Sequence, residues 1–467
     1  MFTSSLRDFV APTFAAPVLG LILGSTELLA AAPPETAPAF EWAASASGLK
    51  NEKTRGVAVD REGNVFLTGE ATDEVRFGSA AVKSAGGSDF FLTKLDAQGR
   101  FLWAHMGGGA LVDRGYGVAT DAAGNCYATG HFQSTDASFS GTTLPNRGDY
   151  DIFVAKYDRD GKLLWVRSAG GKGYDYGHAI AVDGSGDVVV SGAVVGDSEF
   201  GDVKIPNEPG SHIFCAKYHA DGTLVWAKAA TGKAGGSGHG VAVDGQRNIY
   251  IGGLSSGTGQ FGDKPLVTKK GSSAVVAKLS PQGDVRWIAQ QFGEPSCIFH
   301  EITCDEQGRV WASGMFKGTA ALGGATFTTT SAKDADAVLS HFDTDGKLLW
   351  SRVGQGPAVD YGLGIATDGA GNSFLTGEFS ATFRLAGHEL TSRGATDVYV
   401  AKFDAQGEVR WIAHGGGEKG DNAYTMVRDA QGNLLLGGSF GGSAKFDGAE
   451  ITSGGANDLY VVKLPAK

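Results

Sequence analysis

A tryptophan recurs along the chain at a nearly constant spacing, and this period restricts the fold more than any other feature. The spacings are 61, 62, 61, 61, 63 and 61 residues, and the tryptophans are Trp42, Trp103, Trp165, Trp226, Trp287, Trp350 and Trp411. An aspartate that ends a short apolar run keeps the same period, at Asp60, Asp121, Asp183, Asp244, Asp305, Asp368 and Asp429. A length of 467 residues would otherwise suggest two or three domains. Two columns with seven occurrences each indicate a single array of repeats instead.

The pattern inside each repeat is typical of β-strands. In the second full repeat we expect a glycine-rich strand at 115–121 and a second strand at 125–132. A polar connection at 139–147 leads to a third strand at 151–158 and a fourth at 163–168. Turns of the form Asp-x-x-Gly join the first strand to the second and the third to the fourth. Four strands in this period are typical of a propeller blade. We therefore expect an all-β, seven-bladed β-propeller with the tryptophan strands outermost and the glycine-rich strands innermost.

The two ends of the chain complement each other. The last repeat stops at its third strand, residues 458–464, and has no tryptophan strand of its own. Residues 40–44, around Trp42, supply the missing pattern. We expect the Trp42 strand to pair with the strand that contains Val461 and so to complete the last blade, because this pairing covers open strand edges.

The first 32 residues predict a signal peptide. Arg7 is followed by an apolar stretch at 9–23 and by small residues at 30–32. The predicted organisation is a signal peptide at 1–32, a short linker at 33–40 and the propeller at 41–467. We expect no transmembrane anchor after the signal is removed, and a secreted, periplasmic or cell-surface location. Removal of residues 1–32 should leave folding intact.

Charge and motifs exclude several classes of function. The formal net charge is −11 and no basic run is present, so a nucleic-acid partner is not expected. The chain lacks a Gly-x-Ser-x-Gly elbow, a His-Glu-x-x-His zinc motif and a phosphate loop. The four cysteines show no metal-binding or disulfide spacing. We therefore expect no cofactor and no metal, name no catalytic residue and favour a non-enzymatic protein.

Two stretches resemble a known repeat family. Residues 117–130 and 151–158 are similar to the bacterial seven-bladed β-propeller repeat (SBBP) family, and the resemblance covers residues 42–467. It implies an exported bacterial propeller of the kind found in surface or secreted proteins, and it transfers no catalytic residue. Residues 156–165 are also similar to the tryptophan-docking repeat of quinoprotein dehydrogenases. That likeness implies a tryptophan wedged between neighbouring blades, without the redox chemistry, because the chain has no adjacent cysteine pair.

One column varies between the copies just before the inner strand, and its residues are Arg55, Tyr116, His178, His239, His300, Leu363 and Tyr424. A residue repeated in every blade supports every blade equally, so the Trp, Asp and Lys columns are interpreted as structural. A varying column that converges at the channel mouth is where a single site is expected. The candidate ligand-binding residues are His178, His239, His300, Tyr116, Tyr424 and Arg55. The imidazoles could coordinate a transition metal, form the wall of a ligand funnel, or represent packing inherited by copying.

An acidic column lies three residues upstream, at Glu52, Asp113, Asp175, Asp360 and Asp421. It forms either an acidic rim or a set of caps for turn amides, and capping is favoured because aspartate commonly does this.

Two functions stay open from the sequence. The first is an exported, monomeric, non-enzymatic scaffold that binds a protein or glycan partner through one face. The alternative is a carbohydrate-active hydrolase or lyase with its site in the central funnel. A cleft that pairs carboxylates with His or Tyr would favour the enzyme, and a flat, loop-covered face would favour the scaffold.

Overall fold

The computed structural model describes residues 35–206, 208–330 and 334–465. The predicted signal peptide at 1–32 lies outside them. Every regular element in the described residues is a β-strand, which confirms the all-β class. No helix in this part of the chain has the length and apolar character needed to cross a membrane.

Antiparallel pairing places the main strands in successive groups of four. From inner to outer strand, the first group is β2 (Lys53–Val59), β3 (Val65–Phe77), β4 (Ala80–Leu95) and β5 (Phe101–Gly108). The second group is β6 (Asp113–Thr120), β7 (Cys126–Phe132), β10 (Asp151–Tyr157) and β11 (Leu163–Gly171). The third group is β12 (Tyr176–Val182), β13 (Val188–Val195), β16 (Ser211–Tyr218) and β17 (Leu224–Ala229). The fourth is β19 (Gly235–Val243), β20 (Ile249–Phe261), β21 (Lys264–Leu279) and β22 (Val285–Cys304). The long β22 is also the first strand of the next group, with β23 (Val310–Leu322), β25 (Asp336–Phe342) and β26 (Leu348–Gly354). The last groups are β27 (Gly364–Thr367), β28 (Ser373–Phe379), β31 (Asp397–Phe403) and β32 (Val409–Gly417); β33 (Asp421–Arg428), β34 (Leu434–Phe440), β37 (Asp458–Leu464) and β1 (Trp42–Gly48). Short strands and β1 link some of these groups into larger sheets.

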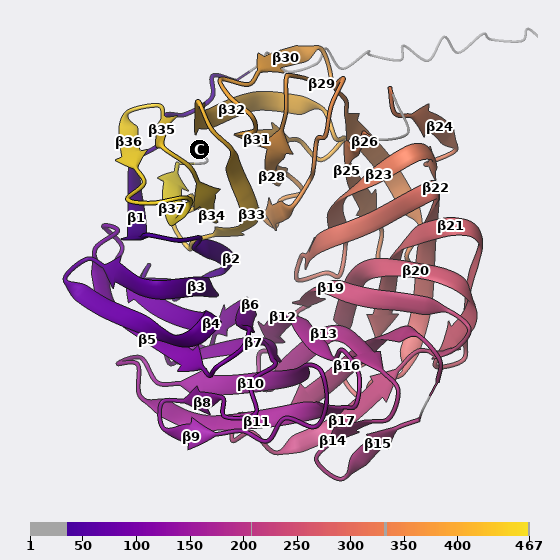
Figure 1. Cartoon of the computed structure of the whole chain (residues 1–467). Coiled ribbons are helices and arrows are strands. Elements are labelled where there is room, and N and C mark those ends of the chain that lie inside the picture. Colours follow the sequence, from indigo (N-terminus) through magenta and orange to yellow (C-terminus); the bar gives the residue numbers. More distant parts are fainter. Residues whose placement is uncertain (1–34, 207, 331–333, 466–467) are drawn as a thin grey trace, which may run out of the picture. The chain divides into compact units, whose positions relative to one another are not determined.

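The groups follow one another around a central opening, as in a propeller (Figure 1). Strands β2, β6, β12, β19 and β33 lie on the inner side of this opening. The tryptophan strands are the fourth members of their groups, as the sequence predicted. Glycine-rich first strands are favoured on the inner side because there the backbones approach closely. A Cβ on Gly117, for example, would lie 3.0 Å from the backbone nitrogen of Ile180 in the next group.

The first strand in the chain pairs with the last one. β1 runs antiparallel to β37, with Trp42 opposite Lys463 and Ala44 opposite Val461. The predicted strand at 40–44 therefore begins two residues later and continues to Gly48. A buried cluster crosses the same junction and joins Val57 and Leu67 near the N-terminus to Val461 near the C-terminus.

The predicted polar connection at 139–147 is wrong in character. It forms a small hairpin of β8 (Ser138–Phe139) and β9 (Thr142–Thr143), in which Phe139 is buried and β8 pairs with β5 of the preceding group. Similar short strands occur in other groups, namely β14 (Ser198–Phe200), β15 (Val203–Ile205), β18 (Thr231–Gly232), β24 (Ala325–Thr328), β29 (Thr382–Leu385), β30 (His388–Thr391), β35 (Ser443–Phe446) and β36 (Ala449–Thr452). Sequence polarity missed these short strands because several of them, such as β9, β24 and β30, contain no buried residue.

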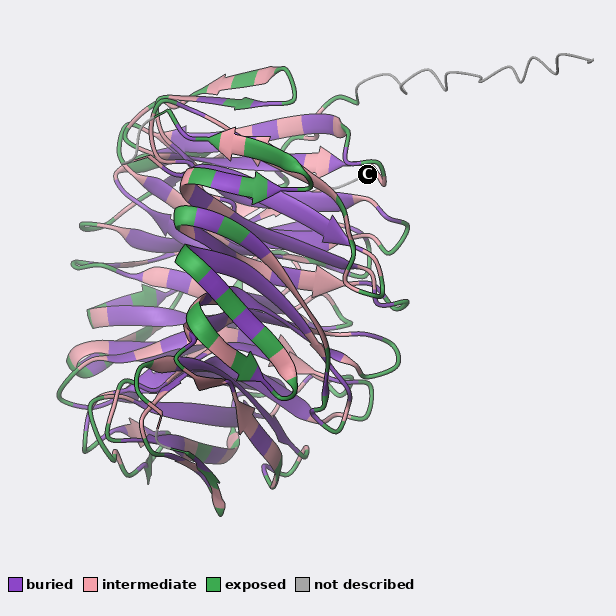
Figure 2. Cartoon of the chain, turned by 90° about the vertical axis from the view of Figure 1, so that its right-hand side faces the viewer, coloured by how far each residue is buried: buried purple, intermediate pink, exposed green. Residues whose placement is uncertain are grey.

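The apolar core lies between neighbouring sheets. One buried cluster combines Ile152 and Val154 of β10 with Val190 of β13 and Phe214 of β16. Buried residues accordingly fill the interior, and strands near the surface alternate between buried and exposed positions (Figure 2). Each sheet therefore depends on its neighbours for burial, as expected for a repeat protein.

The tryptophans dock on the turn glycines of the following group. A Cβ on Gly222 would lie 2.7 Å from the ring of Trp165, whose Nε1 donates to the carbonyl of Ala220 at 3.0 Å. The ring–glycine pairs are Trp42 with Gly99, Trp103 with Gly161, Trp165 with Gly222, Trp226 with Gly283, Trp287 with Gly346 and Trp350 with Gly407. The packing role implied by the tryptophan-docking likeness is therefore present. The Lys column is structural as well, since Lys156 Nζ donates to the same Ala220 carbonyl at 3.1 Å.

Trp411 is covered by a different segment. The backbone N–H of Glu35 donates to the carbonyl of Arg410 at 3.0 Å, and Glu35 pairs with Lys402 at 2.7 Å. Phe40 is buried in the cluster that contains Trp411. The described part of the predicted linker, residues 35–40, thus occupies the place that a turn takes in the other groups.

Candidate functional site

A β-bulge recurs near the start of the inner strands. In β2, Thr54 pairs with Gly69 and Gly56 with Thr68, so Arg55 has no partner across the ladder. The same shift leaves out Tyr116, His178, His239, His300 and Tyr424 in the corresponding strands. A bulge re-aims a side chain and is common beside functional sites. The varying column was expected just before the inner strand. Six residues of the column lie inside their strands, at the bulge, and Leu363 directly precedes β27.

All seven residues of this column line one cavity of about 480 Å³. The column residues are Arg55, Tyr116, His178, His239, His300, Leu363 and Tyr424, and each is half-buried. The structure therefore brings together every predicted ligand-binding residue. The location agrees with the expectation of a site at the channel, and binding stays a prediction.

The column side chains from Arg55 to His300 form a continuous series of cation–ring and ring–ring contacts. The rings of His178 and His239 are stacked with centroids 4.4 Å apart, and Tyr116 lies 4.6 Å from His178 on the other side. His239 and His300 meet edge to face at 5.7 Å. Arg55 lies over Tyr116 at 4.9 Å. Such contacts hold the rings in fixed positions around the opening.

Arg55 is also held by a buried carboxylate. Glu70 on β3 pairs with Arg55 at 2.9 Å and with Arg114 of the next group at 2.6 Å. Burial opposes the charged form of Glu70, but the two arginines keep its pKa below the usual value. Arg55 lies on the other side over Tyr424, at 5.9 Å. Its charge is therefore paired within the protein.

The three histidines are neutral at neutral pH. Burial lowers the pKa of His178 to about 3 and that of His300 to about 4. Burial also lowers the pKa of His239 well below the ordinary value. Its Nε2 lies 2.7 Å from the hydroxyl of Ser237. Neutral imidazoles offer hydrogen-bond donors and acceptors without adding positive charge to the cavity.

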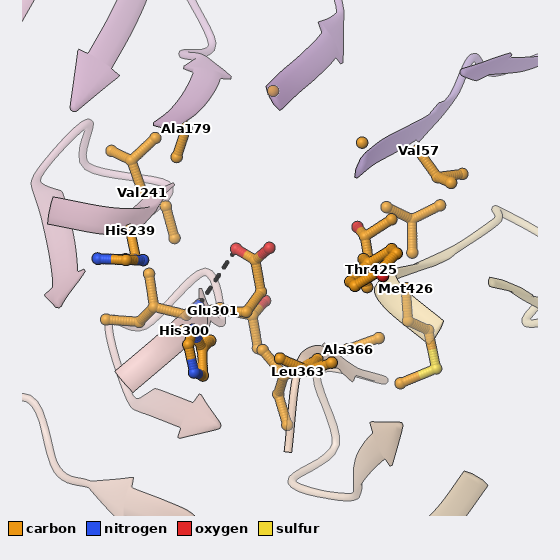
Figure 3. A pocket seen from close by; sticks show the side chains of 18 of the residues that line it. Val57, Ala179, His239, Val241, His300, Glu301, Leu363, Ala366, Thr425 and Met426 are labelled. Atoms are coloured by element: carbon orange, nitrogen blue, oxygen red, sulfur yellow. Dashed lines mark hydrogen bonds between the residues drawn. The ribbon is translucent and has the colours of Figure 1, made fainter. Parts of the chain in front are cut away.

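Glu301 is a functional candidate that the sequence reasoning missed. It follows His300 on β22, and its carboxylate extends into the cavity (Figure 3). Burial raises its pKa to about 7. Comparison of the position after the bulge would have revealed it, since the other copies carry Gly56, Gly117, Ala179, Gly240, Gly364 and Thr425.

The acidic column caps backbone amides. Asp175 accepts from the N–H groups of Gly171 and Val195, each at 2.7 Å. Asp113, Asp360 and Asp421 also accept from backbone N–H groups, which confirms the capping interpretation for these positions. Glu52 differs, because it is buried near Asp458 and burial raises its pKa to about 8.

Three histidines and one carboxylate are among the described residues that line the cavity. Within the described residues, no cluster of three or more His, Cys, Asp or Glu side chains is arranged to hold a metal ion. All four cysteines are free. Glu301 is the one carboxylate among the described residues that line the cavity. Glycosidases generally use two carboxyl groups that flank the scissile bond.

Comparisons with known proteins give one sequence relative and several similar folds. No protein-family model matches the chain. The chain is 29% identical over 429 residues to an uncharacterized WD repeat-containing protein, L264, of Acanthamoeba polyphaga mimivirus. The match covers 73% of this chain and 30% of that relative, so the chain spans less than a third of the relative's length.

Among solved structures, the chain is similar to the Pan2 WD40 domain of Neurospora crassa, with a TM-score of 0.43, 10% identity and coverage of 89% and 90% of the two chains. It is also similar to YCF48 bound to D1 peptide, with a TM-score of 0.38, 9% identity and coverage of 92% and 98%. A polysaccharide lyase of family PL25, an ulvan lyase, gives a TM-score of 0.42, 8% identity and coverage of 87% and 92%. At this level of similarity, function has to be argued from the chain's own residues.

Proposed function

We propose that this protein is an exported, monomeric seven-bladed β-propeller of the SBBP type, closed by its N-terminal strand, that binds a protein or glycan partner through one face. The pairing of β1 with β37 supports the closed ring. The apolar stretch at 9–23 supports export. The name of the viral relative, a WD repeat-containing protein, agrees with a repeat protein.

The observation that carries this proposal is the convergence of the bulged column on one cavity. The copies share their packing residues, yet at the bulge they present Arg55, tyrosines and histidines to a common space. Binding sites combine a concave surface with a few placed polar groups. The face onto which this column opens is therefore the binding face.

An enzyme of the lyase type is the second candidate, because the cavity pairs Glu301 with His and Tyr side chains. Its weakness is the basicity of the histidines. An efficient general acid or base has a pKa near the working pH. The pKa of Glu301, at about 7, meets this condition, but those of His178 and His300 lie far below it, at about 3 and about 4, and so these histidines supply no protonated partner for it. A glycosidase is less favoured still, since it needs a second carboxyl group. The scaffold is the better explanation.

A direct test screens the purified protein on glycan and peptide arrays, together with chromogenic glycosides and uronate polysaccharides. The scaffold predicts binding without turnover. Replacement of His178, His239 and His300 by Ala should remove that binding and leave the melting temperature nearly unchanged. A large loss of stability would assign the histidines to packing between blades, and turnover of any substrate would favour the lyase.

A further inference from the structure

Glu301 occupies the position directly after the bulge, and it differs from the residues at that position in the other copies in a way that packing does not require. A Cβ on Gly56 would lie 2.6 Å from the carbonyl of Tyr116, and a Cβ on Gly364 would lie 2.6 Å from the backbone nitrogen of Met426. The position after the bulge therefore favours small residues, because neighbouring strands approach closely there. Glu301 carries the largest side chain found at the position after the bulge and places it in the cavity.

The carboxylate of Glu301 has little compensation within the protein. Among the described residues, its one hydrogen bond comes from the adjacent N–H of Ile302 at 3.3 Å, and it forms no ion pair (Figure 3). Two arginines line the same cavity: Arg55 is paired with Glu70, and Arg428, at the end of β33, is exposed and forms no ion pair with Glu301. Burial of an unpaired carboxylate disfavours the folded state. A group that costs stability and faces a cavity is a candidate for ligand contact.

The surroundings of Glu301 suit an organic cation. Neutral imidazoles at His178, His239 and His300 provide acceptor nitrogens. The side chains below the bulge are aliphatic and include Val57, Val118, Ile180, Val241 and Ile365. A methylene stem packs well against such a wall while its charged end reaches a carboxylate. The net charge of −11 adds a long-range attraction for cations.

We propose that the cavity binds an ammonium or guanidinium group at the end of an extended chain, as in a lysine or arginine side chain of a partner, and that Glu301 is its counter-ion. The inference rests on the proposed function, and it selects a cationic partner from the wider set of proteins and glycans. The histidines accept hydrogen bonds from the ligand, and the aliphatic wall holds its stem.

Isothermal titration calorimetry on the whole protein tests the proposal with four probes. They are a short neutral peptide with one lysine, the same peptide with acetyl-lysine, the same peptide with arginine, and spermidine. The lysine and arginine peptides should bind, and the acetylated peptide should not. Glu301→Gln should weaken binding roughly 10- to 100-fold, because a charge-assisted contact is lost.

Glu294→Gln is the matched control, since it removes the same charge from an exposed position on β22 and should leave binding unchanged. Equal binding by wild type and Glu301→Gln, or by the lysine and acetyl-lysine peptides, would overturn the proposal. Binding of spermidine without the peptides would support the cation site and assign it to free polyamines. If the arrays yield a ligand that depends on the three histidines but no cationic probe binds, the proposed function stands and this inference fails.

Discussion

At the scale of single residues, the bulge explains how one backbone position can hold different side chains without loss of the fold. A residue without a ladder partner contributes no cross-strand pair, so its identity is free to change. Arg55, His178 and Tyr424 share this backbone position and face the same cavity. Their neighbours one residue later are small, with Glu301 as the exception.

Glu301→Ala should stabilise the protein, and more so at higher pH. Burial raises the pKa of Glu301 from 4.5 to about 7, so the folded state holds a proton that the unfolded state releases. The stability that protonated Glu301 gives to the folded state is fully present below about pH 4.5 and is lost as pH rises through about 7. At pH 8 the variant should gain about 1–3 kcal/mol in free energy of unfolding, with little gain at pH 5.

Denaturant unfolding at the two pH values measures this difference. Glu294→Gln serves again as the control, because its side chain is exposed. Lower stability of Glu301→Ala at pH 8 would mean that the carboxylate takes part in folding, and it would remove the argument that Glu301 is kept for a ligand.

At the scale of elements, the tryptophan strands join one sheet to the next. Trp165 on β11 places its ring over Gly222, in the turn between β16 and β17. Gly222 has a φ of +83°, which favours glycine, and an added Cβ would also meet the ring. The turn and the ring therefore require each other.

Trp165→Ala should destabilise the protein by about 2–4 kcal/mol, since it removes a ring packed between sheets and leaves the Ala220 carbonyl without the Nε1 donor. Leu164→Ala is the control on the same strand, because Leu164 is 48% exposed and should change stability by less than about 1 kcal/mol. Thermal or denaturant unfolding of both variants gives the comparison. Equal losses would show that the ring does not join the sheets.

At the scale of the whole molecule, the N-terminal segment takes the place of parts missing at the other end. β1 supplies an outer strand for β37, and residues 35–40 lie against the region of Trp411. Sequence-distant contacts of this kind are otherwise rare in a repeat protein, where each unit contacts its neighbours. The stability of the whole should depend on this junction.

Two shortened chains test the junction. Deletion of residues 1–32 should leave a protein that folds as the full chain does. Deletion of residues 1–48 removes β1 and Phe40, exposes the edge of β37 and should give aggregation or loss of cooperative unfolding. Size-exclusion chromatography and near-ultraviolet circular dichroism separate these outcomes. Loss of folding in the first deletion would contradict the signal-peptide interpretation, and normal folding in the second would contradict a closed ring.

The sequence alone predicted the strand groups and the column of candidate residues. The Trp and Asp columns and the Asp-x-x-Gly turns are local signals that repeat, so strand order, the outer position of Trp165 and the shared place of His178 and His300 could be inferred. The predicted pairing of the chain's ends also followed, because the last repeat lacks a Trp strand and residues 40–44 supply one.

Tertiary structure decided the rest. The bulge, the exposure of Glu301 to the cavity and the hairpin of β8 and β9 on β5 depend on how strands from different repeats meet. The cover of Trp411 by residues 35–40 likewise joins segments far apart in the chain. A repeat pattern specifies what each copy shares, because the same local packing selects the same residue each time. It does not specify which unlike side chains face one another across a common space, since that depends on the spatial arrangement of the copies.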